Sequence, residues 1–148
     1  MSSEKTLPYE TTILVRDCCL CLHVQRAARA LARRFDEVLR PFGLTNGQFS
    51  LLMSLNRPEP PPMGPVASLL AMDRTTLTAA LKPLERRGLV KVSQDPSDRR
   101  SRILMLTSQG KELLVRALPV WQRTHREVEE LIPTQDPGEL RKSLRAFS

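Results

Sequence analysis

In its second half the chain changes from a helical pattern to a strand pattern within a few residues. Asp73 is well placed to cap a helix that runs to Arg87, and Gly88 is the residue type that commonly ends one. Two β-type runs, 89–93 and 102–106, follow, and the polar, turn-forming stretch QDPSDRRS joins them. This pattern predicts a helix followed by a two-stranded hairpin with a charged tip.

The segments before this helix predict more helices. Apolar side chains recur at three- and four-residue steps over 17–42, which indicates one long amphipathic helix. Thr45 and Gln48 have the spacing of a capping box and indicate where a second helix begins. The prolines of 57–62 exclude a helix there, and a short helix is expected over 64–70.

After the hairpin, Thr107 or Ser108 can cap a long helix in which Pro119 is expected to cause a bend. Trp121 is expected to pack near this bend or in a dimer. A last short helix is expected to carry three apolar residues, Leu140, Leu144 and Phe147. Together these elements predict a mainly α fold with a small β-hairpin wing, which is a winged helix-turn-helix flanked by further helices.

The charge of the chain points to an anionic partner. Its 148 residues include 23 Lys and Arg against 16 Asp and Glu, a formal charge of +7, which favours nucleic acid or an anionic membrane. No apolar run is long enough to cross a bilayer and the first residues lack the order of a secretory signal, so we expect a cytoplasmic protein without a membrane partner. Motifs for phosphate loops, metalloproteases and serine hydrolases are lacking, so we expect neither an enzyme nor a cofactor.

The helix after Asp73 is expected to have two chemically different sides. At about 100° per residue, Leu77, Leu81 and Leu84 fall on one arc, while Arg, Thr and Lys fall on the other. Arg can donate two hydrogen bonds to guanine and Thr can contact a base or a thymine methyl, and these residues lie at the helix end that reaches bases in helix-turn-helix docking. The helix taken alone is equally consistent with an ordinary solvated face.

The expected hairpin tip concentrates charge. An Arg raised on a hairpin can enter a minor groove, whose negative potential attracts it, and a nearby Asp can hold the guanidinium in position. A plain charged turn is the alternative for the tip alone. The candidate DNA-contacting residues of the helix and the tip are Arg74, Thr75, Thr76, Thr78, Lys82, Asp98, Arg99 and Arg100.

At these residues the sequence resembles the MarR family of regulators. The resemblance runs through GLTNGQFSLL, DRTTLTAALKPLERRGLV, DPSDRRS and LMLTSQGKELL, and with the first helix it covers most of the chain. It implies a repressor that binds double-stranded DNA as a homodimer, reads a pseudo-palindromic operator, and is released by a small-molecule effector or by thiol oxidation. It also implies that Arg100 is the minor-groove residue and that Asp98 orients it.

The resemblance further implies how the chain is divided. The segment 1–44 would supply an N-terminal dimerisation helix, and 107–148 would supply C-terminal helices that complete the dimerisation domain by interleaving with those of a second subunit. The segment 45–106 would be the winged helix-turn-helix. All three would belong to one integrated structural domain.

Three cysteines, Cys18, Cys19 and Cys21, lie near the start of the expected first helix. Cys18 and Cys21 should share a face, as should Cys19 and His23. One interpretation is that the cysteines are small buried apolar residues. A second is a metal site that uses Cys19 and His23, although no metal is expected because too few ligands are evident for a closed site.

A third interpretation is redox sensing. Peroxide-responsive members of the family, the OhrR type, carry a reactive cysteine in the first helix, and the resemblance places Cys21 at that position. Those proteins surround the thiol with tyrosines, whereas this chain has only Tyr9, with Phe35 and Phe49 in the helices that would form the pocket. Two other functions stay open, a small thiol-dependent enzyme that uses the cysteine cluster and a winged-helix module that binds protein instead of DNA.

Overall fold

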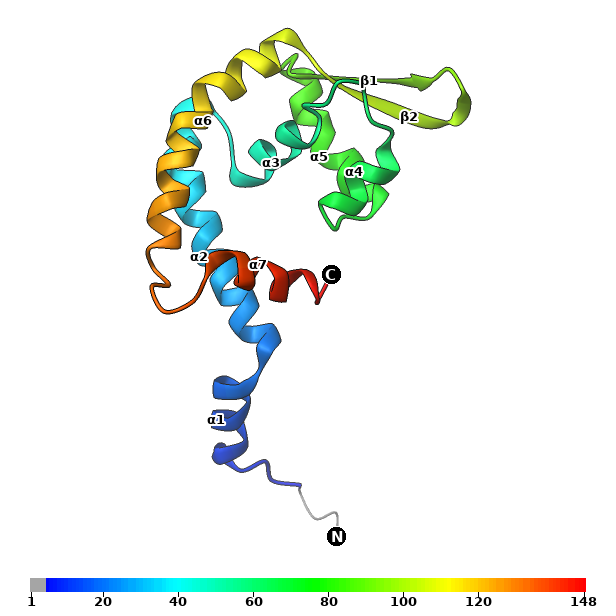
Figure 1. Ribbon diagram of the computed structural model, residues 1–148. Helices are drawn as coiled ribbons and strands as arrows, with labels where there is room; N and C mark the ends of the chain where they lie inside the picture. Colours follow the sequence, from blue (N-terminus) through cyan, green and yellow to red (C-terminus); the bar gives the residue numbers. More distant parts are fainter. Residues whose placement is uncertain (1–4) are drawn as a thin grey trace. The chain divides into compact units, whose positions relative to one another are not determined.

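The computed structural model describes residues 5–148. The described chain is mainly helical and contains one two-stranded antiparallel sheet, as the sequence predicted (Figure 1). Its backbone contacts divide it into two compact units, and the boundary between Arg34 and Phe35 falls inside helix α2.

The first unit contains helix α1 (Tyr9–Cys18) and most of helix α2 (Leu20–Leu39). The prediction of one helix over 17–42 was wrong, because Cys19 has an extended backbone with φ −71° and ψ 109° and separates the two helices. The Cys19 sulfur accepts a hydrogen bond from the Leu22 amide at 3.4 Å, so its side chain meets an amide that the start of α2 leaves free.

The second unit starts in the last turn of α2 and continues into the 3-10 helix η1 (Arg40–Phe42), where the sequence predicted α-helix. Pro41 explains the change, because it lacks the amide that an α-helical hydrogen bond needs. The remaining elements of this unit are α3 (Asn46–Ser54), α4 (Met63–Leu69), α5 (Arg74–Arg86), β1 (Val90–Asp95), β2 (Asp98–Leu106), α6 (Ser108–Glu129) and α7 (Pro137–Arg145).

A leucine-rich core holds the second unit together. Its most buried side chains come from α2, α3, α4, α5 and β2, and α6 adds further buried residues. Burial of apolar surface at about 25 cal/mol per Å² is the main stabilising contribution in such a core. The largest side chains with less than 2% exposure are Leu39, Leu51, Leu52, Leu77, Leu84, Leu104 and Val66.

Three helix starts that the sequence predicted are confirmed. Thr45 and Gln48 form a complete capping box, with both hydrogen bonds at 3.1 Å. The Asp73 carboxylate accepts from the Thr76 amide at 2.7 Å, and the Thr107 hydroxyl oxygen accepts from the Gly110 amide at 3.1 Å. Each of these side chains satisfies an amide that has no partner within its own helix.

The hairpin is longer than the sequence predicted. Pairing extends from Val90 opposite Leu106 to Asp95 opposite Asp98, so most of the predicted connector 94–101 is strand. Strand pairing uses backbone groups and therefore continues past the end of the apolar side-chain pattern. The connection is tight because the Asp95 carboxylate accepts hydrogen bonds from the amide and the hydroxyl of Ser97 at 2.9 and 2.7 Å.

The proline connector 57–62 is not helical, as predicted, and it lies against the hairpin. The carbonyl of Pro61 accepts a hydrogen bond from the Leu104 amide at 2.9 Å, and Pro62 forms an isolated bridge to Ile103. The connector thereby occupies an edge of β2 that would otherwise be unpaired.

Helix α6 continues through Pro119, and its axis bends in Figure 1, as expected. Trp121 on this helix belongs to an aromatic cluster, with ring-centroid distances of 6.3 Å to Phe35, 5.8 Å to Phe49 and 4.8 Å to His125. Phe147 was expected on the last helix. It instead follows the end of α7 and is 65% exposed. Across residues 5–148, every helix is too short or too polar to traverse a lipid bilayer.

Candidate nucleic-acid interface

Helix α5 has the two sides that the sequence predicted. Leu77, Leu81 and Leu84 are at most 3% exposed and pack into the core of the second unit. The polar residues singled out from the sequence all belong to the exposed class, so this part of α5 presents hydrogen-bonding groups and positive charge to solvent. These residues are Arg74, Thr75, Thr76, Thr78 and Lys82.

The start of α5 is held by local hydrogen bonds. The Thr76 amide bonded to Asp73 lowers the pKa of the Asp73 carboxyl below its ordinary value, because that bond favours the charged form. The hydroxyl of Thr78 donates to the carbonyl of Arg74 at 2.8 Å. This bond leaves the methyl group and the acceptor capacity of Thr78 for other contacts.

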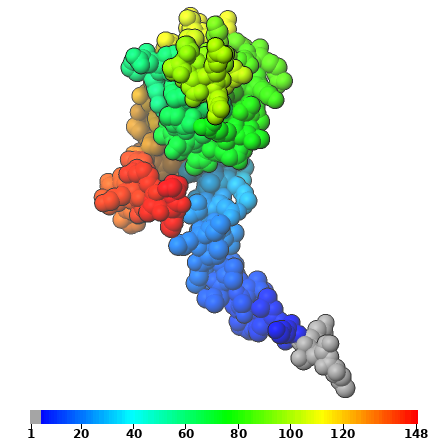
Figure 2. Space-filling model, turned by 90° about the vertical axis from the view of Figure 1, so that its right-hand side faces the viewer, coloured from blue at the N-terminus to red at the C-terminus, as the bar shows by residue number. Residues whose placement is uncertain are grey.

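The hairpin, which we call the wing, exposes Asp98, Arg99 and Arg100 at its tip. It lies in the yellow-green part of the chain that faces the viewer in Figure 2. The Asp98 carboxylate accepts from the backbone amide of Arg100 at 3.0 Å, and the side chain of Gln94 donates to the carbonyl of Arg99 at 3.0 Å. In this structure Asp98 therefore holds the backbone from which Arg100 projects, whereas the expected contact was to the guanidinium.

The wing is fastened to α5. The Glu85 carboxylate accepts a hydrogen bond from the Val92 amide at 3.2 Å, and the carbonyl of Leu84 accepts from the Leu89 amide at 3.0 Å. Glu85 was not among the residues singled out from the sequence, because the local pattern around it gives no sign that it reaches β1. The exposed face of α5 and the wing are thus parts of one hydrogen-bonded unit.

The start of α6 is fastened to the same place. The Thr107 hydroxyl donates to the carbonyl of Gly88 at 2.6 Å, and the Thr107 amide donates to the carbonyl of Leu89 at 3.1 Å. A side chain at Gly110 would overlap the Leu89 carbonyl oxygen and would lie 2.7 Å from the Leu106 side chain. Glycine at position 110 therefore allows α6 to approach the base of the hairpin.

The cationic groups of α5 and the wing are free of carboxylate partners. All ion pairs found within residues 5–148 lie elsewhere, between Arg16 and Asp17, and from Glu129 to His125 and Arg141. Unpaired exposed Arg and Lys can replace the counterions of a phosphate backbone without first breaking an ion pair.

The cysteines do not form the cluster that the sequence predicted. Cys18 ends α1, Cys19 lies between the helices and Cys21 belongs to α2, so Cys18 and Cys21 do not share a helix face. Cys18 and Cys21 are exposed and Cys19 is half-exposed, so the interpretation as buried apolar residues is wrong for this chain taken alone. The Cys21 sulfur accepts a hydrogen bond from the side chain of Gln25 at 2.9 Å.

The metal-site interpretation has no support in the described part of the chain. His23 directs its ring Nδ1 at the carbonyl oxygen of Cys19, 2.8 Å away, and not at the thiol. Among residues 5–148, no three His, Cys, Asp or Glu side chains are grouped so that they could hold a metal ion.

Comparisons with known proteins agree with this arrangement. The model of the MarR family matches residues 44–101. The crystal structure of the Mycobacterium tuberculosis transcriptional regulator MosR in complex with DNA is 34% identical, with a TM-score of 0.76, and the match covers 87% of this chain and 92% of that one. The transcriptional repressor CouR bound to a 23-mer DNA duplex is 31% identical, with a TM-score of 0.72, over 90% of this chain and 92% of that one.

A curated relative supports the same conclusion. The transcriptional repressor MprA of Escherichia coli K12 is 27% identical over 146 residues, which cover 97% of this chain and 80% of the relative. The fold and its exposed basic elements define a winged helix-turn-helix regulator. The chain belongs to the MarR family and is a DNA-binding transcriptional regulator. Because the family and these relatives are regulators and not enzymes, the thiol-dependent enzyme is set aside.

Proposed function

We propose that this regulator represses transcription by binding, as a homodimer, to a pseudo-palindromic operator, and that a small ligand or oxidation of a thiol releases it. The observation that carries the proposal is that the exposed face of α5 and the wing are fixed to each other and free of ion pairs. Two such units, related by a twofold axis, can enter successive major grooves about one helical turn apart.

The residue roles follow from where each side chain lies. Arg74 and Thr78 occupy the first two turns of α5 and would contact base edges, with Thr75 and Thr76 beside them. Lys82, one turn further on, would contact phosphate. Arg99 and Arg100 would reach the minor groove next to the site of α5, and Asp98 would fix the backbone that carries Arg100.

A homodimer is supported by apolar side chains that the chain leaves in solvent. Leu14, Val15 and Leu20 are 60%, 55% and 65% exposed, and α1 buries none of its residues. Helices that bury nothing within their own chain gain stability when a second copy covers them. We therefore propose that 1–44 and 107–148 form the dimerisation region and that 45–106 forms the DNA-binding region.

Operator binding is tested with the purified protein and duplexes selected from genomic DNA, by fluorescence anisotropy over a salt series. We expect specific binding whose affinity falls steeply with salt, and Arg100→Ala should weaken it at least several-fold. Arg123→Ala, an exposed arginine on α6, is the matched control. Unchanged affinity in Arg100→Ala would contradict the wing assignment, and no duplex binding at all would favour a protein-interaction module.

Thiol oxidation is retained as one route of release because the Cys21 thiol is exposed. Peroxide can oxidise an accessible thiolate to a sulfenic acid and is itself reduced to water or an alcohol. Release would then follow if the oxidised group alters how the two copies pack.

A further inference from the structure

One face of α2 carries a row of arginines. Arg26, Arg29 and Arg33 follow one another at steps of three and four residues, so they share a side of the helix, and all three are exposed. From residue 18 to residue 35 the sequence contains no Asp or Glu that could balance them. The residues that line the hollow on this face, which we call the arginine stripe, are His23, Arg26, Ala27, Arg29, Ala30 and Arg33.

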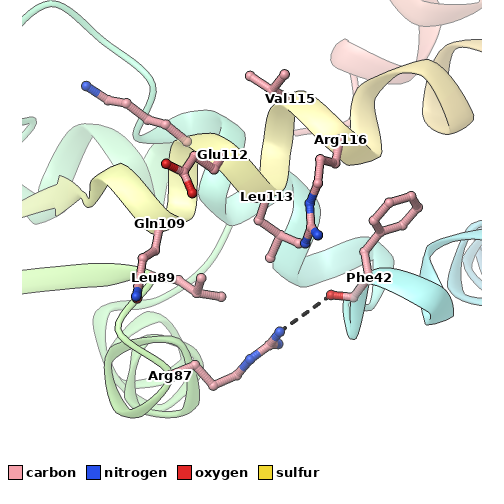
Figure 3. A pocket seen from close by; sticks show the side chains of 9 residues that line it. Phe42, Arg87, Leu89, Gln109, Glu112, Leu113, Val115 and Arg116 are labelled. Carbon is pink, nitrogen blue, oxygen red and sulfur yellow. Dashed lines mark hydrogen bonds between the residues drawn. The ribbon is translucent and has the colours of Figure 1, made fainter.

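The arginines of the stripe have no anionic partner in their own chain as far as residues 5–148 show. Only Arg29 among them forms a side-chain hydrogen bond there, to the neutral oxygen of Gln25 at 3.2 Å, and none forms an ion pair. Arg87, by contrast, donates to two backbone carbonyls, and its bond to the Phe42 carbonyl, at 3.5 Å, is drawn in Figure 3. Like charges three and four residues apart destabilise a helix, so the stripe gains stability when an anionic surface covers it.

The opposite charge is concentrated where α6 ends and α7 begins. Residues 127–139, which we call the acidic segment, contain five carboxylates and no Lys or Arg. Glu127 and Glu130 are exposed at the end of α6, where the helix dipole is already negative and favours cations. Glu129 is the only one of the five that takes part in an ion pair within residues 5–148. The acidic segment therefore presents carboxylates that a cationic surface would stabilise.

Exposed apolar side chains accompany both charged surfaces. Leu131, within the acidic segment, is 59% exposed. Leu20, Val24 and Leu31 are 65%, 40% and 38% exposed, and at about 100° per residue they follow one edge of the arginine stripe along α2. The two surfaces thus match in charge and each offers apolar area that contact between them would remove from water.

We propose that the arginine stripe of one copy binds the acidic segment of a second copy, and that this pairing makes the chain select its own kind as dimer partner. The proposal rests on the homodimer proposed above and adds what determines its selectivity. A twofold axis repeats the contact, so each copy both gives and receives an acidic segment. Complementary charge mainly suppresses wrong partners, because a chain without the matching segment would leave the arginines unpaired or facing like charge.

The first test reverses the charge of the stripe. The stripe variant combines Arg26→Glu, Arg29→Glu and Arg33→Glu, and sedimentation velocity at low salt measures the dimer, since screening is weak there. We expect its dissociation constant to rise at least about tenfold, because each of the two contacts then brings carboxylates together. The control variant makes the same change of charge at exposed positions outside the proposed dimerisation region, namely Arg86→Glu, Lys91→Glu and Arg102→Glu, and should dimerise like wild type.

The second test reverses the other side of the contact. The segment variant combines Glu127→Lys and Glu130→Lys, which places cations at the end of α6, where they favour the helix. A purely structural role of these carboxylates therefore predicts an equally or more stable fold with an unchanged dimer. The proposed pairing predicts a weaker dimer instead, with helical content by circular dichroism like that of wild type.

The third test combines both variants in one chain, the reversed chain, whose stripe is acidic and whose segment is basic. We expect it to dimerise with itself nearly as well as wild type. Co-expressed with wild type, it should form mixed dimers well below the share that random pairing gives, because every mixed contact places like charges together. Native mass spectrometry separates the three dimers by mass, and the control variant should pair with wild type at random.

Wild-type dimerisation by both the stripe variant and the segment variant would overturn the pairing, and so would a reversed chain that stays monomeric. Free mixing of the reversed chain with wild type would show that stripe and segment neutralise each other within one chain, which would also overturn it. A wild-type chain that is monomeric in the same experiment would overturn the proposed homodimer itself.

Discussion

The carboxylate of Asp36 accepts two hydrogen bonds from Asn46, one from its backbone amide at 2.7 Å and one from its side-chain amide at 2.8 Å. They join the last turns of α2 to the first residue of α3. The backbone bond and then the side-chain bond hold the pKa of the Asp36 carboxyl below its ordinary value of 3.8, because both favour the charged form.

Asp36→Asn should therefore reduce the free energy of unfolding at neutral pH, by about 1 to 2 kcal/mol. A lowered pKa in the folded state means that this stabilisation is complete above the ordinary value of 3.8 and is lost as the pH falls through the folded-state value. Urea denaturation at pH 7 and pH 3 should show the difference from wild type shrinking in acid. The neighbouring exposed Glu37→Gln is the control, and a difference independent of pH would contradict the assignment.

Gly110→Ala should destabilise the protein by about 1 to 3 kcal/mol, because the added methyl group has to displace the Leu89 carbonyl or the Leu106 side chain. Gly47→Ala is a matched substitution in another helix, where the nearest atom to the added group is 4.0 Å away. It should be neutral or slightly stabilising. The test is thermal unfolding of both variants, in which Gly110→Ala should melt at a lower temperature than Gly47→Ala. Equal melting temperatures would show that α6 can move away from the hairpin at little cost in stability.

Arg74→Ala and Lys82→Ala should affect DNA binding in different ways. Loss of a base-reading arginine should cost about 1 to 3 kcal/mol on the selected operator and relax the preference at one base pair. Loss of a phosphate contact should weaken all sequences alike and reduce the salt slope by about one. Binding measured on an operator and its single-base variants separates the two, and a uniform loss in Arg74→Ala would remove that residue from base reading.

If thiol oxidation contributes to release, stoichiometric hydrogen peroxide should weaken operator binding by wild type and should not affect Cys21→Ser. Reductant should restore the affinity, because a sulfenic acid or a disulfide is reversible. Cys18→Ser is the matched control, because the Cys18 thiol is also exposed but Cys18 is the last residue of α1 and not part of α2. Equal loss of binding in wild type and Cys21→Ser would leave a ligand as the route of release.

The sequence predicted those features that depend on neighbouring residues. Thr45, Asp73 and Thr107 cap helices through amides at most three residues away, so their spacing alone reveals them. The exposed face of α5 follows in the same way from a periodicity within one helix. These local signals were sufficient for the winged-helix order and for the exposed polar face of α5.

Features that depend on distant residues could not be predicted. Arg87 bonds to Gly43, which lies 44 positions earlier, and neither residue carries a local sign of the other. The interruption at Cys19 was missed for a different reason, since apolar periodicity does not report backbone dihedral angles. In this structure Asp98 bonds to the Arg100 amide, whereas a contact to the guanidinium was expected, and spacing in the sequence cannot distinguish these two groups.

The close approach of Gly110 to Leu89, together with the two hydrogen bonds of Thr107, has a mechanical consequence. Because the start of α6 is both packed against and hydrogen-bonded to the base of the hairpin, these two elements are expected to move together. A rotation of the first half of α6 would therefore displace the hairpin with it. The part of α6 that precedes the bend at Pro119 is therefore the part that is coupled to the hairpin.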